Sequence, residues 1–249
     1  MSTSLPTVNR RSGLANVVDI IIAPNAAFDR IREVPVWGWA FLVATLLGIA
    51  GSLLSSPAVQ HALATSMPAV LATNENIAKL PPDQQQKQIA AFVSFYKNFA
   101  KFSWVFIPVW LLILGLIQGV VMLIANAIGR GSGTFRQYFA LSITVAVVGL
   151  GLSSLVLGVI VALRGADSFE TMTAVQGAIP SLGLIAPGAK GALAGFLGAL
   201  NVFILWATAL LALGMERVGR VSRAPAWAAA IVMLLVTACF AAFGARQNG

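Results

Sequence analysis

The segment VVDIIIAPNAAFDRIREVPVWGW, from Val17 to Trp39, begins as an apolar run, breaks at Pro24 and then carries four charges. At about 100° per residue, the apolar side chains between Pro24 and Pro35 fall in one arc of a helical wheel, and the charged side chains occupy the rest. This pattern predicts an amphipathic helix that lies in a membrane interface, with Asn25 as its N-cap and Pro35 as its end.

Residues three apart on a helix face each other, so we expect Asp29 to pair with Arg32, and Arg30 with Glu33. The preceding residues, 14–21, carry apolar side chains at helical spacing and predict a second short interfacial helix. Two readings of these helices remain open. They either anchor the chain in the interface or present their polar face to a cytoplasmic partner.

The composition of the chain excludes a soluble domain. Hydrophobic residues make up 58% of the 249 positions and charged residues only 10%, against roughly a quarter charged in soluble domains. The net charge is +8, but no basic stripe with interleaved aromatic residues is present, which argues against nucleic acid as a partner. With a single cysteine and a single histidine, the sequence predicts no disulfide, no metal site and no cofactor.

Apolar runs long enough to cross a bilayer, about 20 residues each, predict the fold class. The second run holds 14 Leu, Ile, Phe or Val residues, which favour insertion by about 6 kcal/mol in sum. We expect an all-α polytopic membrane protein, a bundle of five transmembrane helices with interfacial amphipathic helices. The expected spans are residues 36–54, 103–127, 138–163, 192–213 and 225–243.

The distribution of basic residues predicts the orientation. Residues 1–35 and the loops 128–137 and 214–224 lie on one side of the five spans and carry nine arginines, against seven Lys or Arg on the other side. The five-span membrane domain covers residues 36–243. The positive-inside rule therefore places residues 1–35 in the cytoplasm and the short tail, 244–249, outside. Anionic lipid headgroups are the expected partners of these basic residues.

Two outer connections have further predicted features. The outer loop 55–102 carries apolar side chains at helical spacing after Pro82, which predicts an amphipathic helix that lies in the outer interface and continues into the second span. The segment 171–189 has no charge but contains Pro180 and Pro187. It is either a plain outer loop or a re-entrant segment, and we favour the loop.

Intramembrane polar residues are candidates for function, and Gln118, Asn126 and Asn201 are the amides in the expected spans. None of the five spans contains an Asp, Glu, Lys, Arg or His side chain, which argues against charge-coupled transport and against catalysis at membrane depth. Interhelical hydrogen bonds are the favoured role of these amides, and a path for a neutral solute is the alternative. Small residues at spacing four, such as Gly115 and Gly119, indicate either packing within the bundle or a homo-oligomer seam.

Three motifs in order resemble the Ypt-interacting protein (YIP) domain family. They are AP-x-x-AF-x-x-I-x-x-VP at Ala23 to Pro35, GSGTFRQYFALS at Gly131 to Ser142, and NVFILWATALLALGMERV at Asn201 to Val218. The resemblance implies a five-span helical membrane protein without a known catalytic centre. Eukaryotic members are associated with Rab GTPases and early secretory traffic. The short N-terminal segment and the Ala- and Gly-rich composition resemble bacterial members, which implies the bacterial cytoplasmic (inner) membrane.

From these observations we predict a non-catalytic membrane scaffold or adaptor that recruits an unidentified membrane or cytoplasmic protein. The runner-up is a passive channel or carrier for a small neutral solute. The predicted partner surface combines the interfacial helix with the facing cytoplasmic loop. Its residues are Phe28, Asp29, Arg30, Ile31, Arg32, Phe135 and Arg136.

Overall fold

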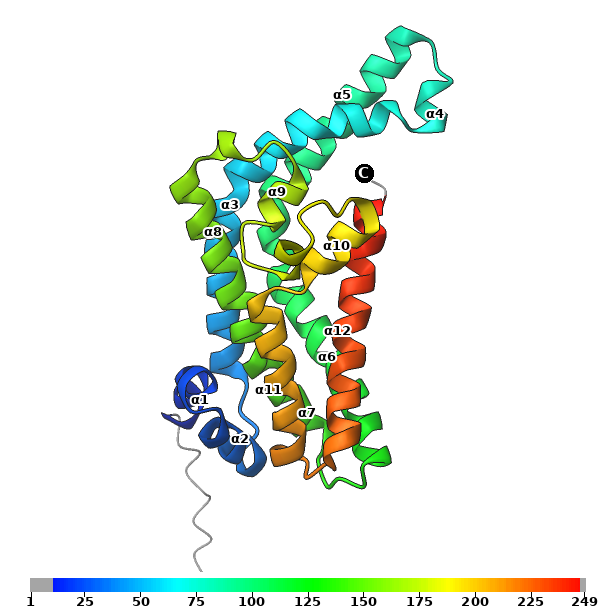
Figure 1. Ribbon diagram of the computed structural model, residues 1–249. Helices are drawn as coiled ribbons and strands as arrows, with labels where there is room; N and C mark the ends of the chain where they lie inside the picture. The colour runs from blue at the N-terminus through cyan, green and yellow to red at the C-terminus, as the bar shows by residue number, and fades with distance from the viewer. Residues whose placement is uncertain (1–10, 247–249) are drawn as a thin grey trace, which may run out of the picture.

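The computed structural model describes residues 11–246, which form a bundle of helices (Figure 1). The elements, in chain order, are α1 (Arg11–Ile22), α2 (Pro24–Glu33), α3 (Gly38–Ala72), α4 (Glu75–Ala78), α5 (Pro82–Phe102), η1 (Ser103–Phe106), α6 (Ile107–Ile128), α7 (Phe135–Ala146), η2 (Val147–Leu152), α8 (Ser153–Arg164), η3 (Ala166–Ser168), α9 (Met172–Gln176), η4 (Leu182–Ile185), α10 (Gly191–Ala199), α11 (Val202–Val218) and α12 (Arg223–Arg246). Over residues 11–246 there is no strand, only an isolated bridge between Ser181 and Asn201.

Four helical stretches are long and apolar enough to cross a membrane. They are Gly38–Ala72, Pro82–Ile128, Phe135–Arg164 and Arg223–Ala245. The all-α polytopic class predicted from the sequence is therefore confirmed. In Figure 1, α1 and α2 lie at the lower end of the bundle, and the C-terminal end of α12 lies at the opposite end.

The fourth expected span is not one continuous helix, so the prediction over 192–213 is wrong in this respect. The helix breaks at Leu200, and the Asn201 side chain accepts hydrogen bonds from the N–H groups of Phe203 and Ile204 as the N-cap of α11. Asn favours caps over helix interiors, because its side chain competes for backbone donors. The 17 residues of α11 rise only about 25 Å, short of the roughly 30 Å of a bilayer core.

The connection over 171–189 pairs with this break. The Leu182 N–H donates to the Leu200 carbonyl at 3.1 Å, and the Val202 N–H donates to the Pro180 carbonyl at 3.3 Å. These bonds satisfy backbone groups that the break would otherwise leave open. Non-helical backbone is tolerated at membrane depth only under that condition.

The expected outer loop 55–102 is largely helical. Helix α3, which contains the first expected span, continues beyond the expected end at Leu54 to Ala72, with Pro57 and Pro68 inside it. Its 35 residues rise about 52 Å, more than a bilayer core requires. The predicted amphipathic helix is present as α5, which continues through η1 into α6. Together the end of α3, α4 and α5 form an arm that projects beyond the bundle (Figure 1).

Small residues set the close approach between the helices. A Cβ on Gly115 would lie 2.7 Å from Ile143 Cδ1, and one on Gly158 would lie 2.6 Å from the Gly51 carbonyl oxygen. Gly195 faces Ala241 and Ala245 of α12 in the same way. The glycines at spacing four therefore pack helices of this same chain against one another.

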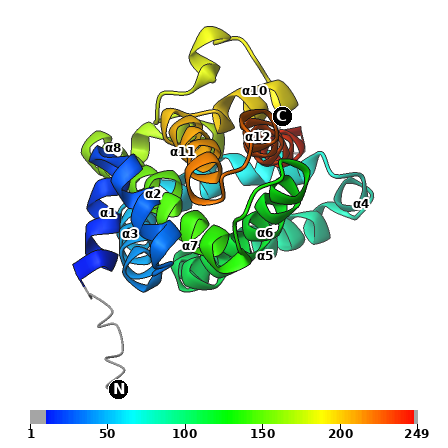
Figure 2. The ribbon, with the colours of Figure 1, turned by 90° about the horizontal axis from the view of Figure 1, so that it is seen from below.

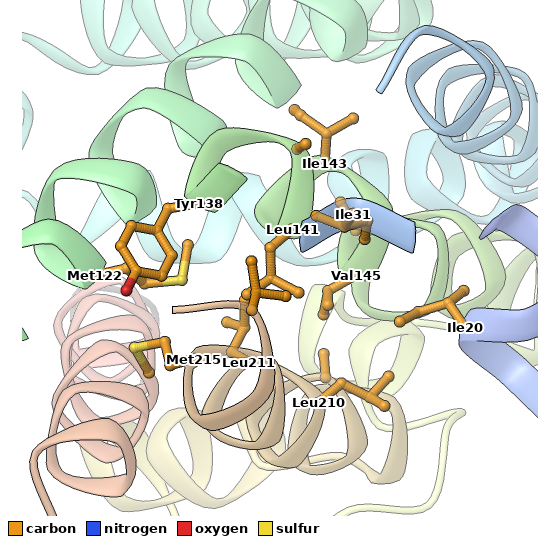
Figure 3. Packing of buried hydrophobic residues seen from close by; sticks show 14 of the residues in the cluster. Ile20, Ile31, Met122, Tyr138, Leu141, Ile143, Val145, Leu210, Leu211 and Met215 are labelled. Atoms are coloured by element: carbon orange, nitrogen blue, oxygen red, sulfur yellow. The ribbon is translucent and has the colours of Figure 1, made fainter. Parts of the chain in front are cut away.

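The main core lies toward the α1–α2 end of the bundle. Figure 3 shows side chains of α1, α2, α6, α7 and α11 converging there. Its largest fully buried members are Tyr138, Phe28, Ile20, Ile31, Leu111, Met122, Leu141, Ile143, Leu210, Met215 and Val147. This core attaches the two N-terminal helices to the bundle.

Candidate functional site

The second helix, α2, is docked on protein rather than on lipid. Its apolar side chains Phe28 and Ile31 are both 0% exposed, and the helix packs against α1, α7 and α11. The amphipathic pattern is therefore satisfied by the bundle, and the expectation that this apolar face lies in the interface is wrong. The cap assignment is also corrected, because Ala23 occupies the N-cap position, Pro24 follows it, and Asn25 lies inside the helix.

A two-pronged ion pair fixes α2 to the end of α11. The Arg217 guanidinium donates from Nε to Asp29 Oδ1 at 2.8 Å and from its terminal nitrogen to Oδ2 at 2.7 Å. The hydrogen bond from Arg217 lowers the pKa of Asp29 most, the charges of Arg217 and Arg32 lower it further, and desolvation opposes the shift. The expected pair of Asp29 with Arg32 is not formed, because a guanidinium from another helix reaches the carboxylate in this bidentate geometry.

Arg30 joins α2 to α1 instead of pairing with Glu33. Its Nε donates to Asn16 Oδ1 at 2.8 Å, and its terminal nitrogen forms an ion pair with Asp19. Asn16 is buried, and its Nδ2 has no hydrogen-bond partner within residues 11–246. Both N-terminal helices are thus held as one unit by polar contacts that link residues more than ten positions apart.

The start of α7 adjoins the end of α2. Thr134 caps α7 in a capping box with Gln137, and the Gln137 Nε2 donates to the Arg32 carbonyl at 2.7 Å. Phe135 remains 38% exposed although its ring lies over Gly119, and Arg136 is exposed. The structure therefore brings the surface-accessible part of the predicted partner surface together.

The seven predicted partner residues fall into three groups. Phe28 and Ile31 belong to the core, which removes them from any surface. Asp29 and Arg30 are engaged in the ion pairs within the chain. Phe135 and Arg136 are exposed at the junction of α2 and α7, and Arg32, which is half-buried, lies at the same junction.

Two loops at this end carry a feature that the sequence reasoning missed. Residues 129–132 read Gly-Arg-Gly-Ser after α6, and residues 219–222 read Gly-Arg-Val-Ser after α11. The loops exchange backbone hydrogen bonds, from the Ser132 N–H to the Gly219 carbonyl at 2.7 Å and from the Ser222 N–H to the Gly129 carbonyl at 3.3 Å. The repeated Gly-Arg-x-Ser at two helix ends was the signal available in the sequence.

The amides expected at membrane depth have defined partners. The Ser142 hydroxyl donates to Gln118 Oε1 at 2.6 Å, which joins α6 to α7. Asn126 Oδ1 accepts from the Tyr138 hydroxyl at 2.6 Å and from the Gly133 N–H at 2.9 Å. Asn201 caps α11 as described above.

A cavity of about 320 Å³ lies between α6, α11, α12 and the π-helical turn η2. Its lining is mostly apolar and includes the side chains of Gln118, Ser154, Thr208 and Thr237. The Gln118 Nε2 makes no hydrogen bond to any residue in the part of the chain that the structure describes. Asn201 does not line this cavity, so the cavity does not join the two amides in one path.

The acidic residues and the single histidine do not assemble into a reactive cluster. Across residues 11–246, no group of three His, Cys, Asp or Glu side chains is positioned to hold a metal ion. His61 Nδ1 lies 3.7 Å from Asp167 Oδ1, and the Asp167 side chain is 99% exposed. Glu216 accepts a hydrogen bond from Trp227 Nε1 at 2.8 Å, a contact that joins α11 to α12.

Comparison with known proteins agrees with this architecture. A family model described as the Yip1 domain matches residues 18–245. The chain is 26% identical to the membrane protein YknW of Bacillus subtilis over 251 aligned residues, which cover 97% of this chain and 96% of that protein. No solved structure matches the chain significantly.

Proposed function

The chain belongs to the Yip1 domain family, and from that premise we propose that it is a non-catalytic integral membrane scaffold that recruits a protein partner at its α1–α2 end. The proposed surface comprises Arg32, Phe135 and Arg136, which we call the α2–α7 surface. Arginine and aromatic residues, Phe among them, are enriched at protein interfaces. The partner is expected to be acidic.

One observation carries the proposal, namely the bond from the Gln137 side chain to the Arg32 carbonyl. It ties the end of α2 to the start of α7, so that residues about a hundred positions apart share one surface. Because α2 is also held by Asp29 and Arg30, this surface is pre-organised, and binding would cost little ordering entropy. A helix that served only as a lipid anchor would not need these contacts.

We place the α1–α2 end in the cytoplasm and the C-terminal end outside, in a bacterial cytoplasmic membrane. The nine arginines of the N-terminal segment and of the two short loops support this orientation through the positive-inside rule. The similarity to a Bacillus subtilis membrane protein supports the bacterial membrane.

The scaffold role is tested by photo-crosslinking in native membranes, with the probe at Arg32 and separately at Arg136. We expect the same protein to be crosslinked from both positions, and we expect Glu at the other position to abolish the product. A probe at Leu184, which is 71% exposed on a connection away from this end, is the matched control. Crosslinks to lipid alone from both positions would refute the scaffold role.

A second candidate function, a passive carrier for a small neutral solute, is favoured by the cavity that contains Gln118. Its unpartnered amide nitrogen, near the middle of α6, offers a hydrogen-bond donor at membrane depth. Flux of glycerol into liposomes tests this function. A rate above that of empty liposomes that falls on Gln118→Leu supports the carrier, and a rate equal to that of empty liposomes refutes it.

A further inference from the structure

The two interlocked loops at the α1–α2 end share a rare backbone conformation. Arg130 has a φ of 51° and Arg220 a φ of 52°. Among residues 11–246 these are the two non-glycine residues with positive φ. Each follows a glycine at the C-cap of its helix, Gly129 for α6 and Gly219 for α11.

This position in a helix terminus usually belongs to glycine. A left-handed residue after the C-cap lets the next N–H turn back to the helix, as the Gly131 N–H does to the Asn126 carbonyl at 2.8 Å. A side chain with a Cβ is strained in that conformation, whereas glycine is not. An arginine that occurs there twice, in the same short motif, indicates that the guanidinium itself is needed.

The negative end of the helix dipole does not explain Arg220. A basic residue within the last helical turn already meets that need without backbone strain, and Arg217 occupies such a position in α11, whereas the last turn of α6 carries no basic residue. Arg130 and Arg220 are exposed, and neither side chain has an ion pair or a hydrogen bond to any residue from 11 to 246. Their charges are therefore not used inside the described part of the fold.

The loops that carry the two arginines are held in place. Besides the two backbone bonds that they exchange, the Asn126 side chain bridges the Gly133 N–H and the buried Tyr138 hydroxyl. A Cβ on Gly219 or Gly133 would collide with the Tyr138 ring system, so the loops pack tightly around it. The view from this end of the bundle shows α6 and the α11–α12 connection side by side (Figure 2).

We propose that Arg130 and Arg220 form a binding site for the phosphate group of an anionic lipid headgroup. Guanidinium groups bind phosphate oxygens in bidentate geometry. The two loops follow helices α6 and α11 at one end of the bundle, where we expect lipid headgroups to surround the chain. Nothing in the proposed scaffold role is required for this site. The lipid would fix the bundle at a defined depth and orientation in its leaflet.

Calorimetric titration of the full-length protein in detergent tests the site with three probes: dihexanoyl phosphatidylglycerol, dihexanoyl phosphatidylcholine and inorganic phosphate. The variants are Arg130→Gly and Arg220→Gly, alone and together, because glycine keeps the left-handed backbone and removes only the side chain. The matched controls, Arg223→Ala and Arg223→Gln, remove an equally exposed arginine near the same end. Thermal unfolding is measured on every variant.

We expect phosphatidylglycerol to bind more tightly than phosphatidylcholine, and each glycine variant to weaken the binding of phosphatidylglycerol about fivefold. The controls should change it little. The glycine variants should also unfold about 3 °C higher, because the strain is relieved. If the double variant loses less affinity for phosphatidylglycerol than the product of the two single fold-losses, both arginines bind the same phosphate.

Four results would overturn the proposal. One is an equal loss of affinity in the control variants, which indicates a diffuse basic surface. A second is unchanged affinity in both glycine variants. A third is inorganic phosphate that binds as tightly as the lipid, which indicates a soluble anion as the ligand. The fourth is a lower unfolding temperature in the glycine variants, which assigns the arginines a structural role.

Discussion

Helices α2 and α5 have the same kind of sequence pattern and opposite surroundings. Both are amphipathic helices that precede a membrane span, and the sequence predicted an interfacial position for each. In the structure, α2 buries Phe28 and Ile31 completely. No residue of α5 is buried, and its aromatic side chains Phe92, Phe95, Tyr96, Phe99 and Phe102 are 41–63% exposed.

The two helices differ in the contacts that their side chains make. Polar side chains of α2 bind residues of α1 and α11, and these contacts hold the apolar face of α2 against the bundle. In α5, the side toward α3 lines an open groove with both apolar and polar side chains, among them Ile89, Val93, Lys97 and Lys101. The aromatic side chains of α5 stay exposed. An amphipathic pattern therefore predicts that the apolar face of a helix is covered. It does not predict whether protein or lipid covers that face.

We expect the largest difference between α2 and α5 in the free energy of unfolding when one aromatic side chain in each helix is truncated. Phe28→Ala should lower the free energy of unfolding by about 3–5 kcal/mol, because it leaves a cavity in the core. Phe95→Ala, at a side chain that is 63% exposed, should change it by less than about 0.5 kcal/mol. Thermal unfolding in detergent measures both. Equal losses would show that α5 is as tightly packed as α2.

The next largest effect concerns two helical glycines. One of them faces another helix and the other does not. Gly158→Ala should destabilise the protein by about 1–3 kcal/mol, because its new Cβ would meet the Gly51 backbone. Gly198→Ala in α10 meets nothing within 4 Å and should be neutral or stabilising by up to about 1 kcal/mol. The same unfolding assay applies. A neutral Gly158→Ala would contradict the close crossing of α3 and α8.

A smaller effect concerns the ion pair that holds α2. Arg217→Asp or Asp29→Arg places like charges together and should speed hydrogen exchange of the α2 backbone several-fold. The double exchange of the two charges restores the attraction and should restore the protection. Exchange over α5 serves as the internal control and should not respond. If neither single variant alters α2, burial of Phe28 and Ile31 alone holds the helix.

The smallest effect is the pH dependence of the same contact. The pKa of Asp29 is lowered from 3.8 in the folded protein, so the carboxylate stays ionised and the contact is complete at neutral pH. Its stabilisation is present above the unfolded-state pKa and is lost as the pH falls through the lower folded-state value. The difference in unfolding temperature between the native protein and Asp29→Asn should be constant above about pH 5. It should vanish in stronger acid.

Specific residues show where sequence reasoning succeeded. The apolar runs predicted the long membrane helices, because about 20 lipid-facing residues leave no alternative to a helix. The position of Asn201 within an apolar run was noticed, but its role as a helix cap was not predicted. The backbone on either side of Asn201 is paired with Pro180 and Leu182, which come from another part of the chain. The predicted partners of Asp29 and Arg30 were wrong, because the residues that these side chains bind lie on other helices.

Composition and the length of the apolar runs are sufficient to identify a helical membrane protein, because both are local properties that do not depend on tertiary neighbours. The sequence also determined that α2 and α5 are amphipathic. The tertiary structure decided what covers each helix, that 192–213 divides at Leu200, and that the loops at 129–132 and 219–222 interlock. These features depend on contacts between residues far apart in the chain. Periodicity within one helix carries no information about such contacts.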